Sequence, residues 1–179
     1  MKQHTDGLPR PLESLAVWML NRVGKIWTER FYNAVNRITA LTAVYPVVLR
    51  QRNGKVQVLL TTRNDLIYQG MVHHPGSMVR WSDQPGNWRE ARGFDAAVER
   101  VREKELGGVS FNTFAFAGSL FHQTPRGAEI AVVFACELAS GKNPSAGEWY
   151  DVSSLPANLI EHEFAVNLTA VRKFRELIA

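Results

Sequence analysis

The sequence contains one cysteine, no long apolar run and only a small excess of charge of one sign. Because Cys136 has no second thiol to pair with, an internal disulfide framework and a multi-thiolate zinc site are excluded, and a reducing compartment is favoured. Charged residues interrupt each apolar stretch before the roughly 20 residues that a membrane helix needs. The first residues are polar and lack the pattern of a secretory signal. We therefore expect a cytoplasmic protein with no membrane partner.

The composition indicates one folded domain with an appendage. The chain has 179 residues, of which 45% are apolar and 21% charged, as in globular proteins rather than fibrous or disordered ones. The net charge of +4 suits an anionic small molecule. Because the basic residues are dispersed and no recognition motif accompanies them, we expect no nucleic-acid partner. Cys136 lies in an apolar run and is expected in the core.

Apolar residues at steps of three and four predict a helical segment between residues 12 and 38. This helix could pack on the domain, join two copies as a homodimer, or lie on a membrane surface. The mixed charge of its polar face disfavours the membrane surface. We therefore expect a helical extension at residues 1–40, followed by a domain at residues 41–179.

The rest of the chain alternates strand-like and helix-like spacing. We predict strands at 43–49, 56–60, 114–121 and 130–138, and helices at 94–106 and 159–177. Asn53 and Gly54 predict a tight hairpin turn between the first two strands. The order predicts an α/β (α+β) fold in which a mixed β-sheet lies between helices.

One charged residue lies on the apolar face of the predicted helix at 94–106. At roughly 100° per residue, the apolar stripe contains Ala97, Val98 and Val101. Glu105 falls in the same stripe, whereas the other charged residues of the helix lie to its sides. A carboxylate there loses hydration and meets the negative end of the helix dipole. It therefore needs an arginine, a path to solvent, or a divalent metal ion.

A set of spaced motifs surrounds this glutamate. A loop containing Pro-Gly spans His74–Val79, Asp83 follows it, and the segment Ala97–Gly107 carries Arg100 and Glu105 at fixed positions before a glycine. Together these residues resemble a degenerate Nudix box. The resemblance implies a Nudix-like fold over the predicted domain, with the helical extension outside it.

The box departs from the family pattern in five places, two of which are Ser77 for a glycine and Asp83 for a glutamate. Val101 and Lys104 stand where the family has glutamates, and residues 84–92 resemble an insertion. The helix is closest to the variant of GDP-mannose mannosyl hydrolases, which keeps one ligand carboxylate. In this sequence the retained carboxylate is Glu105.

The resemblance implies a magnesium site, which manganese could also fill. Glu105 would be the first ligand, and a backbone carbonyl of the Gly76–Ser77 turn the second. Asp83 would either coordinate the metal or pair with Arg100, as its family counterpart does. Few protein oxygens make a weak site, so we expect metal binding to depend on the phosphates of the substrate. No histidine pair has helical spacing, so a histidine metal cluster is not predicted.

Several residues are candidates for substrate contacts. The candidates for phosphate are Arg63, Arg80 and Arg50, and those for stacking on a base or sugar are Trp81 and Tyr68. The general base would be His162, whose reference pKa suits proton transfer near neutrality, or Glu148.

The resemblance implies a magnesium-dependent hydrolase of a nucleoside diphosphate linked to another moiety, such as a nucleotide sugar. The alternative is a catalytically impaired Nudix-like module that binds nucleotides or regulates. The losses at Val101 and Lys104 motivate this alternative.

Overall fold

The computed structural model describes residues 40–80, 83, 94–125, 127–139, 144 and 146–179. Three sequence-based predictions lie outside these residues: the N-terminal helical extension and its homodimer, the inserted segment 84–92, and the stacking residue Trp81. Among the described helices, none is long and apolar enough to cross a membrane.

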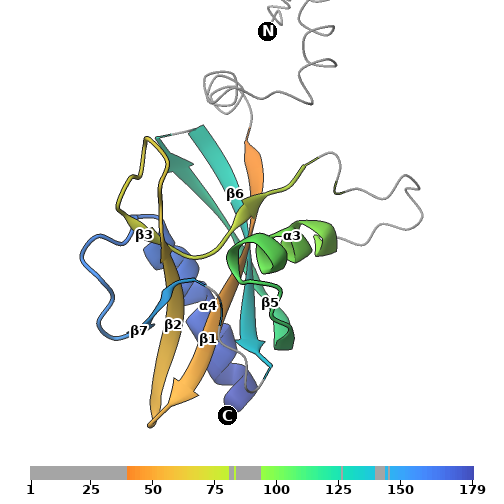
Figure 1. Ribbon diagram of the computed structural model, residues 1–179, viewed down its shortest axis with the longest axis vertical. Coiled ribbons are helices and arrows are strands. Elements are labelled where there is room, and N and C mark those ends of the chain that lie inside the picture. The colour runs from red at the N-terminus through yellow and green to blue at the C-terminus, as the bar shows by residue number, and fades with distance from the viewer. Residues whose placement is uncertain (1–39, 81–82, 84–93, 126, 140–143, 145) are drawn as a thin grey trace, which may run out of the picture.

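Seven strands of the described part form one mixed sheet, in the order β3-β2-β1-β6-β5 (Figure 1). The short strand β4 pairs with β1, and β7 pairs with β2. Strands β1 and β6 run parallel, and the other pairs are antiparallel. The bounds are β1 Leu41–Arg52, β2 Lys55–Thr62, β3 Val72–His73, β4 Ser77–Met78, β5 Phe111–Thr124, β6 Gly127–Leu138 and β7 Glu148–Asp151.

The predicted hairpin is confirmed. Asn53 has a φ of 52° and Gly54 a φ of 74°, so both central residues of the turn are left-handed, as a type I′ turn requires. The turn aligns β1 with β2, and Arg52 pairs with Lys55 directly beside it. This register places β1 in the centre of the sheet, where its apolar run is buried on both faces.

The two helices of the described residues cover opposite faces of the sheet (Figure 1). Helix α3, Asp95–Glu105, packs Ala97 and Val101 against Val44 of β1. Helix α4, Glu163–Ile178, packs its buried residues against Tyr45 and Val47 on the other face of the same strand. Alternate residues of β1 therefore serve two cores. The predicted mixed sheet between helices is confirmed, and Cys136 is fully buried as expected.

The last helix begins later than the spacing predicts. Instead of starting the helix, Leu159 forms an isolated bridge with Val72, and the backbone N–H of Ile160 donates to the Val72 carbonyl at 3.0 Å. Both residues are buried, so their apolar character reflects packing beside β3 rather than a helical stripe. This pairing brings the first turn of α4 next to the end of β3.

We expect the core beneath α4 to be sensitive to truncation. Phe174 is 1% exposed, so Phe174→Ala should lower the free energy of unfolding by about 3 to 5 kcal/mol. Leu168→Ala, on the same helix but 71% exposed, should change it by less than about 0.5 kcal/mol. Urea denaturation followed by circular dichroism measures both. Equal effects of the two substitutions would contradict this packing of α4.

Candidate functional site

Glu105 is the last residue of α3 and is half-buried at the end of the sheet. Burial raises the pKa of its carboxyl group, and the negative charge of Glu163 raises it further. A hydrogen bond from the backbone N–H of Gly76 and the positive charge of Arg63 act in the opposite direction. The carboxylate predicted from the helical stripe therefore faces the Pro-Gly turn, with an arginine nearby.

Gly76 is required for this arrangement because the turn lies directly on β1. A Cβ atom at Gly76 would meet the ring of Tyr45 at 3.0 Å and the carbonyl oxygen of Val44 at 3.2 Å. A side chain would push the turn away from the strand and its N–H away from Glu105.

A second carboxylate, Glu163, enters from the first turn of α4 and is fully buried. Its Oε2 lies 2.6 Å from His74 Nδ1 and 3.4 Å from the His74 backbone nitrogen. Burial raises the pKa of this carboxyl group, but the hydrogen bond and charge of His74, with the charges of His73 and His162, lower it more. Glu163 is therefore ionised at neutral pH.

The other oxygen of this group, Glu163 Oε1, is buried and has no hydrogen-bond partner among the described residues. Its nearest charged neighbour is His162 Nε2, at 3.7 Å. The sequence reasoning missed Glu163, although it shares the buried face of α4 with Val166 and Ala170 at helical spacing. The same stripe analysis that found Glu105 would have found it. We call Glu105 and Glu163 the carboxylate pair.

Arg63 follows β2 and lies beside the carboxylate pair. Its positive charge lowers the pKa of Glu105 and, after burial, contributes to the lowered pKa values of His73 and His162. Its Nη1 donates to Asp65 Oδ2 at 3.1 Å, and its guanidinium carbon lies 5.9 Å from the ring of Tyr68.

His162 stands at the N-cap of α4, with its ring centre 6.1 Å from that of Tyr68. Burial, followed by the charges of His122 and Arg63, lowers the pKa of His162, so its imidazole is neutral near pH 7. Four of the sequence candidates thus lie in one region: Glu105, Arg63, Tyr68 and His162.

Asp83, Arg100 and Ser77 form a separate group behind the turn. Arg100 Nη1 donates to Asp83 Oδ1, and Nη2 donates to Asp83 Oδ2 at 3.0 Å. Arg100 Nη2 also donates to Ser77 Oγ at 3.2 Å and to the Met78 carbonyl at 2.7 Å. The backbone N–H of Arg80 donates to Asp83 Oδ2 at 2.7 Å. Both Asp83 oxygens are therefore engaged, which favours the ion pair over metal coordination.

The remaining residues predicted from the sequence, Glu148, Arg50 and Arg80, make contacts away from the carboxylate pair. Glu148 is exposed on β7 and accepts a hydrogen bond from the Tyr150 hydroxyl at 2.8 Å. Arg50 lies 3.9 Å above the Trp149 ring, and its Nε donates to Gln57. Arg80 is exposed, and its charge contributes to the lowered pKa of Asp83. Within the described residues, no hydrogen bond or ion pair joins Glu148, Arg50 or Arg80 to the carboxylate pair.

Comparisons with known proteins extend the structural picture. Neither a family model nor a curated protein sequence matches the chain. Solved structures do match. The NUDIX domain of Shewanella oneidensis NrtR, complexed with ADP ribose, has a TM-score of 0.58 and 15% identity, covering 83% of this chain and 99% of that one.

Two further solved structures match the fold of this chain. The MutT NUDIX hydrolase from Burkholderia pseudomallei has a TM-score of 0.54 and 18% identity, covering 73% of this chain and 98% of that one. The C. elegans Ap4A hydrolase has a TM-score of 0.53 and 16% identity, covering 79% and 100%. The fold is therefore that of Nudix domains, as the box resemblance implied. The closer resemblance to GDP-mannose mannosyl hydrolases stays a prediction.

The buried histidine beside this site should make stability depend on pH. Burial, the charge of Arg63 and the neighbouring His74 lower the pKa of His73 to about 4, while Glu163 partly opposes them. The unfolded chain binds a proton at this residue below about pH 6.5, and the folded chain does so only near pH 4. The free energy of unfolding should therefore fall as the pH decreases from about 6.5 to about 4.

The variant His73→Gln cannot titrate and isolates this contribution. Urea unfolding at pH 7 and pH 4.5 should show a loss of about 2 kcal/mol more in the wild type than in the variant. Thr61, whose hydroxyl lies 3.0 Å from His73 Nε2, serves as the control through Thr61→Val, which should keep the pH dependence. Parallel pH profiles for wild type and His73→Gln would show that the histidine titrates normally.

Proposed function

We propose that this Nudix-fold chain is a magnesium-dependent hydrolase of a nucleoside diphosphate linked to another group, with nucleotide sugars among the candidate substrates. One observation supports this above the others. Two glutamates from helices on opposite faces of the sheet converge near one glycine turn, and an arginine lies beside them. Buried carboxylates next to an arginine are what a metal and a phosphate group would need.

The residues fit a divalent ion that prefers oxygen ligands. The carboxylate of Glu105 and a backbone carbonyl of the Gly76–Ser77 turn would hold Mg²⁺, and Mn²⁺ would accept the same ligands. When bound, the ion would neutralise charge on the phosphate oxygens and make a nearby water more acidic. Asp83 and Arg100 would fix the turn through their ion pair rather than bind the metal.

Glu163 is the proton acceptor in this proposal, through Oε1. That oxygen has no partner among the described residues, whereas Oε2 is held by His74. A carboxylate with a lowered pKa is a weak base, so it suits a water that a metal ion has already acidified. His162, neutral and 3.7 Å from Oε1, is the second candidate. Glu148 is less suited because it is exposed and bonded to Tyr150.

Arg63 would bind the diphosphate. Its Nε is buried without a hydrogen-bond partner among the described residues, and its charge already reaches Glu105. A phosphate oxygen would satisfy that donor. Arg80, exposed at the far side of the turn, is a further candidate for an outer phosphate. The ADP ribose complexed with the NUDIX domain of NrtR supports a nucleotide derivative as the ligand.

Glu105→Gln should lower turnover of ADP ribose with Mg²⁺ by roughly 100-fold or more, because it removes the one charged ligand of the proposed metal site. Glu103→Gln is the matched control. Glu103 lies on the same helix with a 56% exposed side chain and pairs with Arg102, so its loss should leave turnover unchanged. Product release from a panel of nucleoside diphosphate derivatives, measured by chromatography, tests both variants.

Two outcomes separate the hydrolase from its alternative. Equal turnover by the wild type and Glu105→Gln would rule out Glu105 as the metal ligand. Binding of ADP ribose in the presence of a chelator, with no turnover of any compound, would identify a nucleotide-binding module instead. The substitutions at Val101 and Lys104 motivate that alternative.

Glu163→Gln tests the proposed base. It keeps the size of the side chain and the hydrogen bond to His74 but removes the proton acceptor, so kcat should fall by roughly 100-fold or more. KM should change little, since Arg63 still binds the phosphates. Steady-state kinetics on protein shown to be folded by circular dichroism measures this split. An increase in KM at constant kcat would mean that Glu163 contributes to binding rather than to proton transfer.

A further inference from the structure

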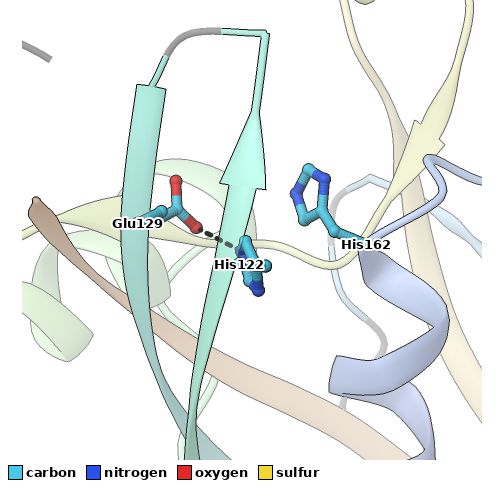
Figure 2. Close-up of side chains that lie close together, drawn as sticks. All are labelled: His122, Glu129 and His162. Carbon is cyan, nitrogen blue, oxygen red and sulfur yellow. Dashed lines mark hydrogen bonds and ion pairs between the residues drawn. The ribbon is translucent and has the colours of Figure 1, made fainter. Parts of the chain in front are cut away.

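Three side chains from separate elements meet beside the first turn of α4 (Figure 2). His122 comes from the end of β5, Glu129 from the start of β6, and His162 from the N-cap of α4. Their side chains are 14%, 8% and 12% exposed, respectively. One nitrogen or oxygen atom from each lies within 4.8 Å of the others. We call these residues the His-Glu-His triad.

We propose that the His-Glu-His triad binds a zinc ion, through a set of ligands that shares no residue with the magnesium site proposed at Glu105. This inference does not rest on the hydrolase reaction, which uses His162 only as a second candidate base. The bound ion would join the β5–β6 hairpin to the start of α4.

The spacing of the triad is close to what zinc requires. His122 Nε2 lies 3.2 Å from Glu129 Oε1. Zinc bonds of about 2.0 to 2.1 Å in tetrahedral geometry place neighbouring ligand atoms about 3.4 Å apart, so this pair already has the right separation. The ring of His162 lies 4.6 Å from that of His122, at an angle of 29°. The ligand atom of His162 lies within 4.8 Å of those of His122 and Glu129, against the ideal separation of about 3.4 Å. A rotation of the His162 ring therefore has to shorten these distances by at most about 1.4 Å.

The ligand types select zinc over magnesium. Two imidazoles and one carboxylate suit zinc and its transition-metal neighbours, whereas magnesium prefers oxygen ligands alone. Three protein ligands with a fourth position left for water is the arrangement of a reactive zinc site rather than of a closed structural one. His162 is neutral near pH 7, so a ring nitrogen is available to a metal without loss of a proton.

Outer contacts that orient metal ligands are already present. The Tyr45 hydroxyl donates to Glu129 Oε1 at 2.7 Å. Glu163 Oε1 lies 3.7 Å from His162 Nε2, so zinc on Nδ1 would direct the Nε2 proton at this buried carboxylate oxygen. Histidines that bind metals usually donate their second ring proton in this way. That hydrogen bond would compete with the role of Glu163 Oε1 as the proposed proton acceptor.

Without a metal, the region leaves polar atoms unsatisfied. His122 Nδ1 and Glu163 Oε1 are both buried and have no hydrogen-bond partner in the described part of the chain. Unpaired buried polar atoms cost free energy, so each of these two atoms calls for an explanation.

The test uses the full chain stripped with a chelator and titrated with Zn²⁺ by calorimetry. We expect one equivalent to bind, and His122→Asn and His162→Asn to weaken it at least about 100-fold, since even outer contacts of a metal site contribute 10- to 100-fold. Glu103→Gln, which changes an exposed side chain on α3, is the control and should bind normally. Zn²⁺ should also raise the Tm of the wild type but not of the two triad variants.

Glu105→Gln separates the two metal sites. It should bind Zn²⁺ as the wild type does, and millimolar Mg²⁺ should not displace the zinc. Absence of Zn²⁺ binding, or binding that survives both triad substitutions, overturns the proposal. Loss of zinc in Glu105→Gln also overturns it, because the zinc would then occupy the site proposed for magnesium.

The wild type alone provides a further test that no folding defect can affect. X-ray absorption of the zinc-loaded chain should show two imidazoles and at least one oxygen in the first shell. A shell made only of oxygen atoms would contradict the triad even if the histidine variants failed to fold.

Discussion

The buried pair of His74 and Glu163 is the interaction on which the site depends. It joins the residue before the Pro-Gly turn to the first residue of α4, and both side chains are fully buried. Burying a carboxylate is costly, and leaving it without its hydrogen-bond partner typically costs about 3 to 5 kcal/mol. Helix α4 therefore fixes the turn that contains Gly76. The same contact fixes the hydrogen bond from Gly76 to Glu105. The position of one helix fixes the surroundings of a carboxylate on the other.

The two members of the carboxylate pair have opposite electrostatic environments. Glu105 lies at the C-terminal end of a helix, where the dipole is negative, and burial raises its pKa. Glu163 lies at the N-terminal end of a helix, where the dipole favours negative charge, and His74 lowers its pKa against the effect of burial. Neighbouring carboxyl groups whose pKa values are driven apart can divide two chemical roles between them.

Much of the fold could be predicted because its signals are local. The turn at Asn53 and Gly54 aligns β1 and β2, and the stripe of α3 identified Glu105 as a carboxylate facing inwards. Glu163 carries the same signal, since it shares the buried stripe of α4 with Val166 and Ala170. The start of that helix was predicted wrongly at Leu159. Leu159 pairs with β3 instead, a contact between residues 87 positions apart that no local pattern shows.

The His-Glu-His triad lay beyond prediction for the same reason. Its members belong to three elements, and only the register of the β5–β6 hairpin and the start of α4 bring them together. Spacing along the chain predicts metal ligands only when they share one helix or loop.

The delivery of Glu105 and Glu163 by helices on opposite faces of β1 has a consequence for how the chain folds. Each helix supplies one carboxylate, Glu105 from α3 and Glu163 from α4. A chain in which only one helix has docked on the sheet therefore lacks the carboxylate pair. The central parallel pairing of β1 with β6 joins distant segments and is expected to form slowly. Assembly of the site should thus coincide with completion of the fold, because both helices must have docked on β1 before the two carboxylates meet.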